Sequence, residues 1–510
     1  MPGGERGLLG IHDAQNDLRE RESKEQGEPM VLRVKFYTKR EERAPKPKLG
    51  VGMWTAAARA VAGRCFSSQM TGKARTLCTF GKRIIDRASC EGELRVFIVA
   101  GEVSGDSMAS RLMSSLKIIS PIPVHYSGVG GVLMHQEGLQ SLFPMEDISV
   151  MGIFELLPYL NKIRMRLKMT LKAAILFKPH VVVTVDSKGF SFRLLKRLQA
   201  RLAKEEDRPV YIHYIAPSFW AWKGGERRLG NLSEFVDHML CILPFEDEIC
   251  RLNGIAASYV GHPVLEDALR LNKELDAQSI RWRLQEKKNT FRQQHGIPSG
   301  NTIITLLPGS RMQEVKRMLP IFSQTMESLA NSFTGLSVVI PVAPNQQVAS
   351  YIEKVIQTWS ISTTLISGMS VEERYTAFSA SRAALSTSGS AVMELLLAGL
   401  PSVVAYRAHF LTEWFIRFRT KLQFISLPNI LLGSMVIPEA LFNSCTHKNL
   451  KVALSKVILD EDSRRQQLAA AEKVFRLLSP QDLQSITEDN FPSMKAASII
   501  LDVAKQRLRV

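Results

Sequence analysis

The chain has 510 residues and a mass of 57.1 kDa, which is too long for one ordinary domain and enough for two or three. Apolar residues make up 45% and charged residues 23%, which excludes a largely disordered or collagen-like protein. The formal net charge is +17, and no stretch approaches the ~18 uninterrupted apolar residues of a membrane-spanning helix. The six cysteines form no Cys-x-x-Cys pair, so neither a disulfide scaffold nor a structural zinc site is indicated.

The N-terminal segment predicts a targeting leader. Residues 1–52 mix both charge signs without apolar periodicity and are expected to be disordered. Residues 53–85 carry six Lys or Arg side chains and no acidic one, which is typical of a mitochondrial transit peptide, with a plastid peptide as second choice. We therefore expect a leader over 1–92, with a transit peptide at about 53–90 and Met53 as the working start. A solvated basic tail is the alternative.

From Leu94 the chain alternates short β-branched runs with helical patterns. Apolar strands that alternate with helices indicate a parallel sheet covered on both faces. One such run fills residues 93–265, and a second fills 301–510, which also holds the C-terminal helices. The expected strands lie at 94–100, 124–130, 181–186, 210–217 and 239–244, and then at 302–310, 336–344, 383–390 and 401–406.

A charged helical stretch over 266–300 separates the two runs and is expected to be a linker. The predicted fold class is therefore α/β, with two Rossmann-like doubly wound domains that face a cleft. Ligands of such folds bind outside the carboxyl ends of the strands, so the cleft is the expected active site.

Two strand ends in the first domain carry candidate chemistry. The segment GEVSGD (101–106) follows a strand, its glycines let the backbone approach a ligand, and the helix start favours an anion. Asp186 ends an apolar strand, so its carboxylate is expected to point into the cleft and to take a proton from an attacking hydroxyl. The alternatives are a plain strand-to-helix turn at 101–106 and a capping role for Asp186.

Two glycine turns in the second domain predict a diphosphate site. In LLPGSR (306–311), Arg311 is placed for bidentate contact with a phosphate, although pairing with Glu314 is the alternative. In STSGSAVME (386–394), small residues at a helix start present N–H groups to a phosphate, and Glu394 can accept hydrogen bonds from ribose hydroxyls. The alternative for this second turn is an ordinary capped helix.

Two basic amphipathic segments indicate contact with an anionic lipid surface. Residues 156–178 contain six Lys or Arg and no acidic residue, and residues 409–424 set aromatic side chains beside basic ones. Core-facing helices with solvated basic backs are the alternative. The residues expected to touch the membrane are Arg164, Arg166, Lys168, Trp414 and Phe415.

Neither a metal site nor a nucleic-acid interface is indicated. The acidic run at 460–462 reads as a solvated turn rather than as a strand-end carboxylate pair that holds Mg²⁺ against a diphosphate. The sequence contains no zinc finger and no aromatic–basic RNA signature. We therefore expect no metal, no cofactor and no nucleic-acid partner.

Eight segments between about residues 96 and 478 occur together and in an order that closely resembles lipid-A-disaccharide synthase. No single segment is decisive, but the ordered set is specific. The segments are AGEVSGD (100–106), GVGGVLMHQEGLQSLFPMEDISVMGIFELLP (128–158), IAPSFWAWK (215–223), ILPFE (242–246), VGHP (260–263), LLPGSR (306–311), TSGSAVMELLLAGLPSVVAYR (387–407) and ISLPNILLG (425–433).

The resemblance implies a metal-independent, inverting glycosyltransferase of the GT-B type, with two Rossmann-like domains. It implies UDP-2,3-diacylglucosamine as donor, bound by the second domain, and 2,3-diacylglucosamine 1-phosphate as acceptor, bound by the first. The products are a β-1,6-linked tetraacyl disaccharide 1-phosphate and UDP. Such enzymes are peripheral membrane proteins and often domain-swapped homodimers. The resemblance implies that Glu102, Ser104, Asp106 and Asp186 are catalytic, with Asp186 as the base, and that Arg311, Ser388, Gly389, Ser390, Glu394 and Asn429 bind UDP.

The sequence departs from the family pattern at two positions. The turn after Asp186 reads Ser-Lys-Gly-Phe, where the family usually has Pro before the Gly, so Lys188 can depress the pKa of the base or meet the acceptor phosphate. Ser390 replaces the family's Thr and keeps the hydroxyl. The rival functions are another UDP-sugar enzyme of the same fold, either an epimerase or a glycosyltransferase, and a non-catalytic lipid-binding protein.

Overall fold

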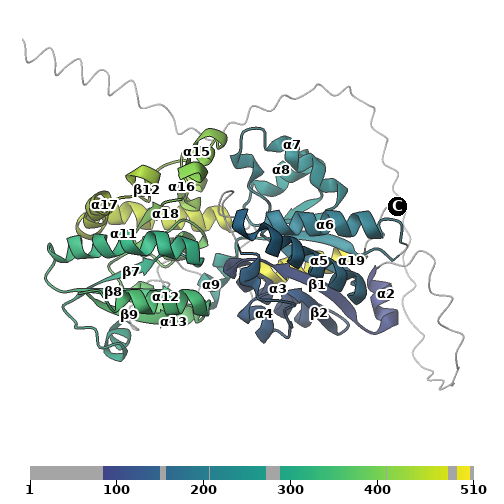
Figure 1. Cartoon of the computed structure of the whole chain (residues 1–510), viewed down its shortest axis with the longest axis horizontal. Coiled ribbons are helices and arrows are strands. Elements are labelled where there is room, and N and C mark those ends of the chain that lie inside the picture. The colour runs from purple at the N-terminus through teal and green to yellow at the C-terminus, as the bar shows by residue number, and fades with distance from the viewer. Residues whose placement is uncertain are drawn as a thin grey trace, which may run out of the picture. The chain divides into compact units, whose positions relative to one another are not determined.

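The computed structural model describes residues 84–149, 157–205, 207–271, 288–408, 410–479 and 491–505. The predicted leader up to residue 83, and with it most of the transit peptide, lies outside the described residues. The central part of the predicted linker, residues 272–287, also lies outside them. The described residues form two six-stranded sheets, one in each predicted domain, with helices on both faces (Figure 1). The predicted α/β class is confirmed.

The first sheet is parallel throughout and has the strand order β2-β1-β3-β4-β5-β6. Its strands are β1 (Leu94–Ala100), β2 (Val124–Val129), β3 (Val181–Val185), β4 (Val210–Tyr214), β5 (His238–Cys241) and β6 (Ala257–Tyr259). The helices of this part of the chain are α2 (Ile84–Glu91), α3 (Val103–Ile119), α4 (Val132–Gln136), α5 (Leu160–Phe177), α6 (Lys188–Leu202), α7 (Glu226–Gly230), α8 (Glu246–Leu252) and α9 (Pro263–Leu271). Short η turns lie at Met145–Asp147, Leu157–Tyr159, Phe219–Ala221 and Asn231–Glu234.

The second sheet is also parallel and has the order β12-β11-β10-β7-β8-β9. Its strands are β7 (Thr302–Leu307), β8 (Leu336–Val342), β9 (Ser362–Ser367), β10 (Ala383–Ser386), β11 (Ser402–Tyr406) and β12 (Glu439–Leu441). The helices are α11 (Met312–Ala330), α12 (Gln346–Ile356), α13 (Val371–Ala380), α14 (Ser390–Leu397), α15 (Phe410–Arg419), α16 (Leu427–Leu432), α17 (His447–Leu459), α18 (Glu461–Leu478) and α19 (Pro492–Lys505), with an η turn at Phe442–Ser444.

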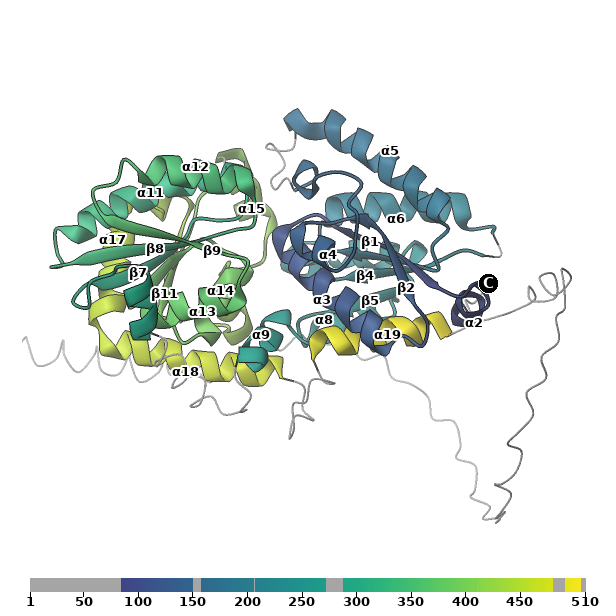
Figure 2. The same cartoon turned by 90° about the horizontal axis from the view of Figure 1, so that it is seen from below.

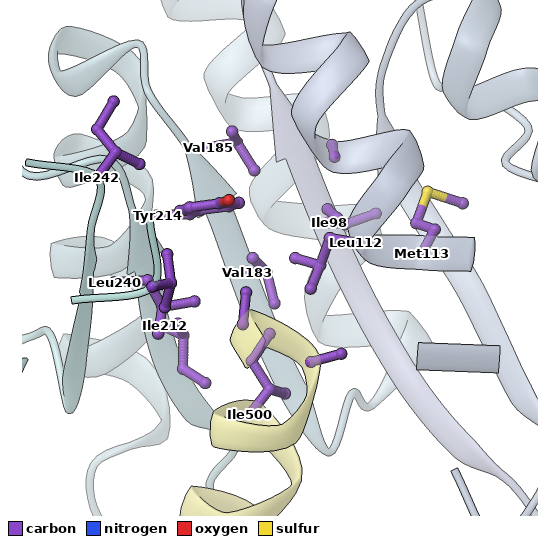
Figure 3. Packing of buried hydrophobic residues seen from close by; sticks show 14 of the residues in the cluster. Ile98, Leu112, Met113, Val183, Val185, Ile212, Tyr214, Leu240, Ile242 and Ile500 are labelled. Carbon is purple, nitrogen blue, oxygen red and sulfur yellow. The ribbon is translucent and has the colours of Figure 1, made fainter. Parts of the chain in front are cut away.

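Successive side chains of the central strands enter different cores, as expected for a sheet that is covered on both faces. Ile98 of β1 lies in the core that α3 and α19 cover, whereas Phe97 lies in the core that α5 and α6 cover. Figure 3 shows the first of these cores, where Ile500 of α19 lies near Val183 of β3. Both sheets therefore require near-continuous apolar strands. Because such runs stand out in the sequence, most of these strands could be predicted from it.

The folded region begins before the predicted end of the leader. Ile84, Ile85 and Ala88 of α2 are buried in the core beneath α3 and α19, and Arg87 pairs with Asp207 at 2.8 Å. The prediction that the leader extends to residue 92 is therefore wrong for residues 84–92. These three apolar residues form a core-facing stripe of α2.

The last described helix packs on the first sheet and not on the second. Ala496, Ile500 and Ala504 of α19 recur at helical spacing and are buried with α3, and Ser493 hydrogen-bonds Ser115 at 2.9 Å. Figure 2 shows α19 beside α3. The prediction that residues 301–510 form one domain with its own C-terminal helices therefore needs correction. We use "first domain" for residues 84–271 together with α19, and "second domain" for residues 288–479.

Three short or edge strands escaped prediction. Strands β6 and β12 have three residues each, and β9 is an edge strand with the polar start Ser-Thr-Thr. Residues 288–294 are helical, and Phe291 among them is buried against Ile303. The second domain therefore begins within the predicted linker, because this helix contributes to its core.

Candidate active site

The loop between β1 and α3 presents two of the predicted site residues. Glu102 is the N-cap residue of α3 in an extended conformation, and Ser104 lies in the first turn of the helix. Both side chains are half-buried and line a cavity at the carboxyl end of the first sheet. This position follows from the topology, because parallel strands deliver their following loops to the same edge.

The turn between β3 and α6 carries the predicted base. Asp186 and the next residue, Ser187, both have left-handed backbones, with φ of 50° and 45°. For non-glycine residues this conformation costs ~1–3 kcal/mol each and persists only where surrounding structure holds it. Here the N–H of Asp186 donates to the carbonyl of Tyr214 at 3.0 Å, and the hydroxyl of Ser191 donates to the carbonyl of Asp186 at 2.7 Å. The carboxylate of Asp186 is thus held at the cavity wall.

Gly101 lets the two first-domain loops touch. A Cβ atom at this position would collide with the hydroxyl of Ser187 and lie 2.8 Å from its Cβ. We expect Gly101→Ala to displace the turn that carries Asp186 and to lower kcat by about 10²-fold, because small displacements of a reacting group have effects of that size. Steady-state turnover measured alongside UDP affinity tests this, and UDP affinity should stay unchanged.

The close approach of Gly101 to Ser187 also predicts that a second substitution restores the activity of Gly101→Ala. Ser187→Gly removes both obstructing atoms and suits the left-handed backbone, so it should restore turnover to Gly101→Ala. Gly300→Ala is a matched control, since its added Cβ would have no neighbour within 4 Å. A Gly101→Ala enzyme with the wild-type rate would contradict the requirement for this close approach.

The loop between β7 and α11 brings Arg311 to the same region. Arg311 forms an ion pair with Glu102, which joins the second domain to the first. The carboxylate of Glu314 instead accepts the backbone N–H groups of Ser310 and Arg311 and the hydroxyl of Thr387. Glu314 therefore stabilises its own loop and lies in the field of Arg311, and Arg311 also pairs with a carboxylate of the other domain.

The start of α14 faces the same cavity. Gly389 occupies the N-cap position with φ of 134°, and no side chain of the described residues caps the helix. The N–H of Thr387 donates to the carbonyl of Leu307 at 3.0 Å, which holds this loop against the β7–α11 loop. Uncapped N–H groups at a helix start form a site for an anion. We call Arg311 and residues 388–391 the diphosphate cradle.

Two cavities share this wall. The larger, of about 740 Å³, is lined by Glu102, Ser104 and Asp186 of the first domain and by most of the cradle. The smaller, of about 370 Å³, is lined by the whole cradle, with Glu102 and Ser104 but not Asp186. The rest of the larger cavity is mostly apolar, with a wall formed by Ala221, Trp222, Ile416, Leu422, Phe424, Ile425, Leu427, Leu441 and Phe442.

The two first-domain carboxylates have perturbed proton affinities. Burial, together with the nearby charge of Asp186, raises the pKa of Glu102 to about 7 despite the lowering effect of Arg311. Burial raises the pKa of Asp186, opposed by the N–H of Ser187 and by Arg311 and Lys188. Two carboxylates in one desolvated site hold protons more tightly than ordinary surface acids, which suits a proton acceptor working near neutral pH.

Glu394 lies one turn into α14 and lines both cavities. Its carboxylate accepts a hydrogen bond from the Nε of Arg374 at 3.2 Å. Burial raises the pKa of Glu394, and Arg374 opposes that effect. Arg374 also lines the smaller cavity, but it reaches the site from the face of α13, and no sequence motif marked it.

Two predicted site residues have structural positions instead. Asp106 is buried, and its carboxylate accepts the backbone N–H groups of Gly131, Leu133 and Met134 at 2.8–3.1 Å, which caps α4. The side chain of Asn429 is buried and binds the backbone of residues 436 and 437 and the carboxylate of Glu439. Neither residue lines either cavity. The predicted catalytic role of Asp106 and UDP-binding role of Asn429 therefore become positioning roles.

Of the three residues of α5 predicted to touch the membrane, two are exposed and one has a structural role. Arg164 and Lys168 on α5 are exposed, but the Nε of Arg166 donates to Asp147 at 2.8 Å and its guanidinium lies over the ring of Phe143 at 4.7 Å. Arg166 is thus a half-buried structural residue. None of the helices that the structure describes is long and apolar enough to cross a membrane.

On α15, one predicted aromatic residue faces outward and one does not. Trp414 is 66% exposed and stacks on Phe418, 62% exposed, with ring centroids 5.8 Å apart. Phe415 instead packs against Trp222 of the first domain at 5.8 Å. The prediction is therefore corrected at this helix, because Phe418 and not Phe415 accompanies Trp414 on the exposed face.

The acidic run near the C-terminus has ordinary partners. Asp460 caps α18 by accepting the N–H of Asp462 at 3.0 Å, and Glu461 pairs with Arg382 at 2.7 Å. Within the described parts of the chain, no group of three or more His, Cys, Asp or Glu side chains is arranged to hold a metal ion.

Two parallel doubly wound domains whose strand ends share one cavity define the GT-B class of fold. A family model described as lipid-A-disaccharide synthetase matches residues 96–488. The chain belongs to the lipid-A-disaccharide synthase family. It is 54% identical to the probable mitochondrial lipid-A-disaccharide synthase of Arabidopsis thaliana, over 83% of this chain and 94% of that protein. It is 37% identical to the lipid-A-disaccharide synthase of Rhodospirillum centenum, over 81% of this chain and 96% of that protein.

Solved structures with a similar arrangement include UDP-N-acetylglucosamine 2-epimerase from Neisseria meningitidis bound to UDP-GlcNAc. It has a TM-score of 0.49 and 14% sequence identity, and the match covers 80% of this chain and 98% of that chain. A similarity of this size carries no inference about activity.

Proposed function

We propose that this chain is an inverting glycosyltransferase that joins UDP-2,3-diacylglucosamine to 2,3-diacylglucosamine 1-phosphate, giving lipid A disaccharide 1-phosphate and UDP. One observation carries this proposal: Asp186 and most of the diphosphate cradle line the same cavity of about 740 Å³. Family membership supports the same reaction. The apolar wall of the cavity offers a surface for the acyl chains of both substrates.

In the proposed reaction, Asp186 accepts the proton of the acceptor's 6-hydroxyl while that oxygen attacks the donor's anomeric carbon. The bond from this carbon to UDP breaks on the opposite face, and its electron pair stays on the diphosphate. Arg311 and the start of α14 meet the developing charge, and each such fixed donor is worth ~3–4 kcal/mol in a site without water. No step requires a metal or a cofactor.

The ion pair between Arg311 and Glu102 has a place in this scheme. A bound diphosphate gives Arg311 a second anionic partner beside Glu102. A pKa of about 7 allows Glu102 to take up a proton as the diphosphate arrives. Arg311 then faces the diphosphate without the charge of Glu102 beside it. Glu102 thus adjusts the charge of the cradle to its ligand.

The test is formation of a lipid disaccharide by the purified full-length chain, separated by thin-layer chromatography. Rescue of a bacterium depleted of its own lipid-A-disaccharide synthase, with Asp186→Asn as inactive control, is the matching test in cells. An epimerised UDP-sugar without disaccharide would favour the rival enzyme. Vesicle binding without release of UDP would favour a lipid-binding scaffold, and either result would contradict the proposal.

We further propose that the protein is a peripheral membrane protein of the mitochondrion. The exposed Trp414–Phe418 stack and the exposed basic residues of α5 support contact with an anionic lipid surface. The name of the Arabidopsis relative and the Arg-rich composition of residues 53–83 support the location. A reporter fused to residues 1–83 that remains in the cytosol would contradict it. A homodimer remains a prediction, which light scattering of the purified chain tests.

The membrane proposal predicts a localised loss of lipid binding. The double variant Trp414→Ala/Phe418→Ala should bind anionic vesicles at least about tenfold more weakly in a sedimentation assay, because each large apolar side chain contributes ~1.5–3 kcal/mol when buried. Val452→Ala/Leu459→Ala on α17 is the control, since both residues are exposed apolar side chains on another helix. Equal loss in both double variants would remove the special role of α15.

A further inference from the structure

Lys188 lies in the cavity without a described role in the transfer reaction. It lines the cavity of about 740 Å³ but not the smaller cavity, which the cradle dominates. Its Nζ lies 5.6 Å from the ring centre of Phe219 and 5.8 Å from that of Trp222. Two aromatic faces attract the ammonium group and hold it on the first-domain side of the cavity.

Three arginines around the two cavities form ion pairs, whereas Lys188 forms none with a described residue. Arg311 pairs with Glu102, Arg111 pairs with Asp267 at 2.6 Å, and Arg374 pairs with Glu394. Arg417 also lines the larger cavity, but its guanidinium lies over the ring of Phe442 at 5.1 Å, in the second domain. Among the described residues no carboxylate lies within ion-pair distance of Lys188, although the field of Asp186 reaches it. The side chain stays accessible from the cavity, yet surrounding atoms displace enough water to lower the pKa of Lys188. An anion in the cavity would satisfy this partly desolvated charge.

We propose that Lys188, held by Phe219 and Trp222, is the subsite that binds the sugar phosphate of the acceptor. The inference rests on the proposed glycosyl transfer and adds a selectivity to it. A diacylglucosamine that carries the phosphate is then the preferred acceptor, because Lys188 attracts the phosphate charge. The apolar wall of the cavity does not distinguish the two acceptors. The donor's diphosphate already has Arg311 and the start of α14 as partners, which line both cavities, whereas Lys188 lines only the larger cavity, beside Asp186.

The chemistry of the acceptor fits this position. In glucosamine 1-phosphate only the ring oxygen separates carbon 1, which carries the phosphate, from carbon 5, which carries the 6-hydroxymethyl group. A base for the 6-hydroxyl and a cation for the 1-phosphate therefore lie along the same edge of the sugar ring. Asp186 and Lys188 fit this arrangement, because they lie two residues apart on one turn and line one cavity.

The experiment compares two acceptors, 2,3-diacylglucosamine 1-phosphate and the same lipid without the phosphate, at a fixed donor concentration. We expect the wild-type chain to prefer the phosphorylated acceptor. Lys188→Met should lower kcat/KM for that acceptor by about 10–100-fold, the value of one charged hydrogen bond, mainly through a higher KM. Its kcat/KM for the unphosphorylated acceptor should fall by a much smaller factor, because loss of Lys188 raises the pKa of Asp186 for both acceptors but removes a phosphate contact for only one of them. Lys188→Arg should restore most of the preference.

Lys223→Met is the matched control. Lys223 also lies over an aromatic ring, that of Phe418 at 5.7 Å, but it does not line the cavity. Equal losses on both acceptors in Lys188→Met would show that Lys188 acts through Asp186, and would overturn the inference. So would a wild-type enzyme that uses both acceptors equally well, which is measurable whether or not the variant folds. Disaccharide formed with an unchanged acceptor ratio rejects only this inference, whereas no disaccharide from either acceptor rejects the proposed function and the inference with it.

Discussion

Replacing Asp186 with asparagine lowers the turnover of disaccharide formation by about 10²–10⁴-fold while UDP still binds, because a positioned general base contributes a factor of that size. The amide keeps the size of the side chain but cannot accept the proton of the 6-hydroxyl. The cradle is made by other loops, so it stays intact in this variant. Single-turnover product formation and calorimetric titration with UDP measure the two effects separately.

The wild-type pH profile provides a second test of the base. Burial raises the pKa of Asp186, so the rate should fall, as the pH is lowered, at a higher pH than an ordinary aspartate would give. Asp462→Asn is the control, because Asp462 is 78% exposed and its carboxylate pairs with the surface residue Arg465. A near wild-type rate for Asp186→Asn would show that another group accepts the proton.

Replacing Arg311 with alanine weakens UDP binding by about 10–100-fold, because a hydrogen bond to a charged group is worth ~1.5–3 kcal/mol. The rate also falls, since the same guanidinium stabilises the charge that develops on the departing diphosphate. The variant additionally leaves Glu102 without its ion-pair partner, and loss of the lowering effect of Arg311 raises the pKa of Glu102 further. Calorimetric titration with UDP at several pH values measures both consequences.

The contrast between the two variants is the informative result. Asp186→Asn should change turnover and spare UDP affinity, whereas Arg311→Ala should change both. Arg465→Ala is the control for the arginine, because its side chain is 76% exposed and pairs only with the surface residue Asp462 among the described residues. Unchanged UDP affinity in Arg311→Ala would remove this residue from the cradle.

Local sequence patterns were sufficient for the main strands and for the loops that follow them. Strand β1 occupies the predicted residues, and the apolar runs that became β3 and β7 end where the site loops begin. A parallel sheet buried on both faces leaves a long apolar signal, and the topology brings the carboxyl ends of its strands to one edge. The convergence of Arg311 and the start of α14 at one edge of the second sheet follows from those two facts, whereas packing of the domains brings Asp186 to the same cavity.

Patterns were insufficient wherever the direction of a side chain depends on a partner far away in the sequence. Asp106 and Asn429 stand in motifs that suggest chemistry, but their polar atoms bind the backbone of neighbouring segments. Phe415 lies in an aromatic, basic helix and yet packs on Trp222, nearly 200 residues earlier. The sequence contains no local signal that distinguishes these residues from ligand-binding ones.

The sequence by itself thus determined the α/β class, the two domains and the strand ends that carry the reactive groups, because periodicity and glycine turns are local properties. Tertiary structure alone decided that α2 and α19 complete the first domain, that Glu102 is the ion-pair partner of Arg311, and that Lys188 lies between two aromatic rings at the cavity. These contacts join segments distant in the chain, and their energy depends on packing and desolvation, which a linear pattern does not encode.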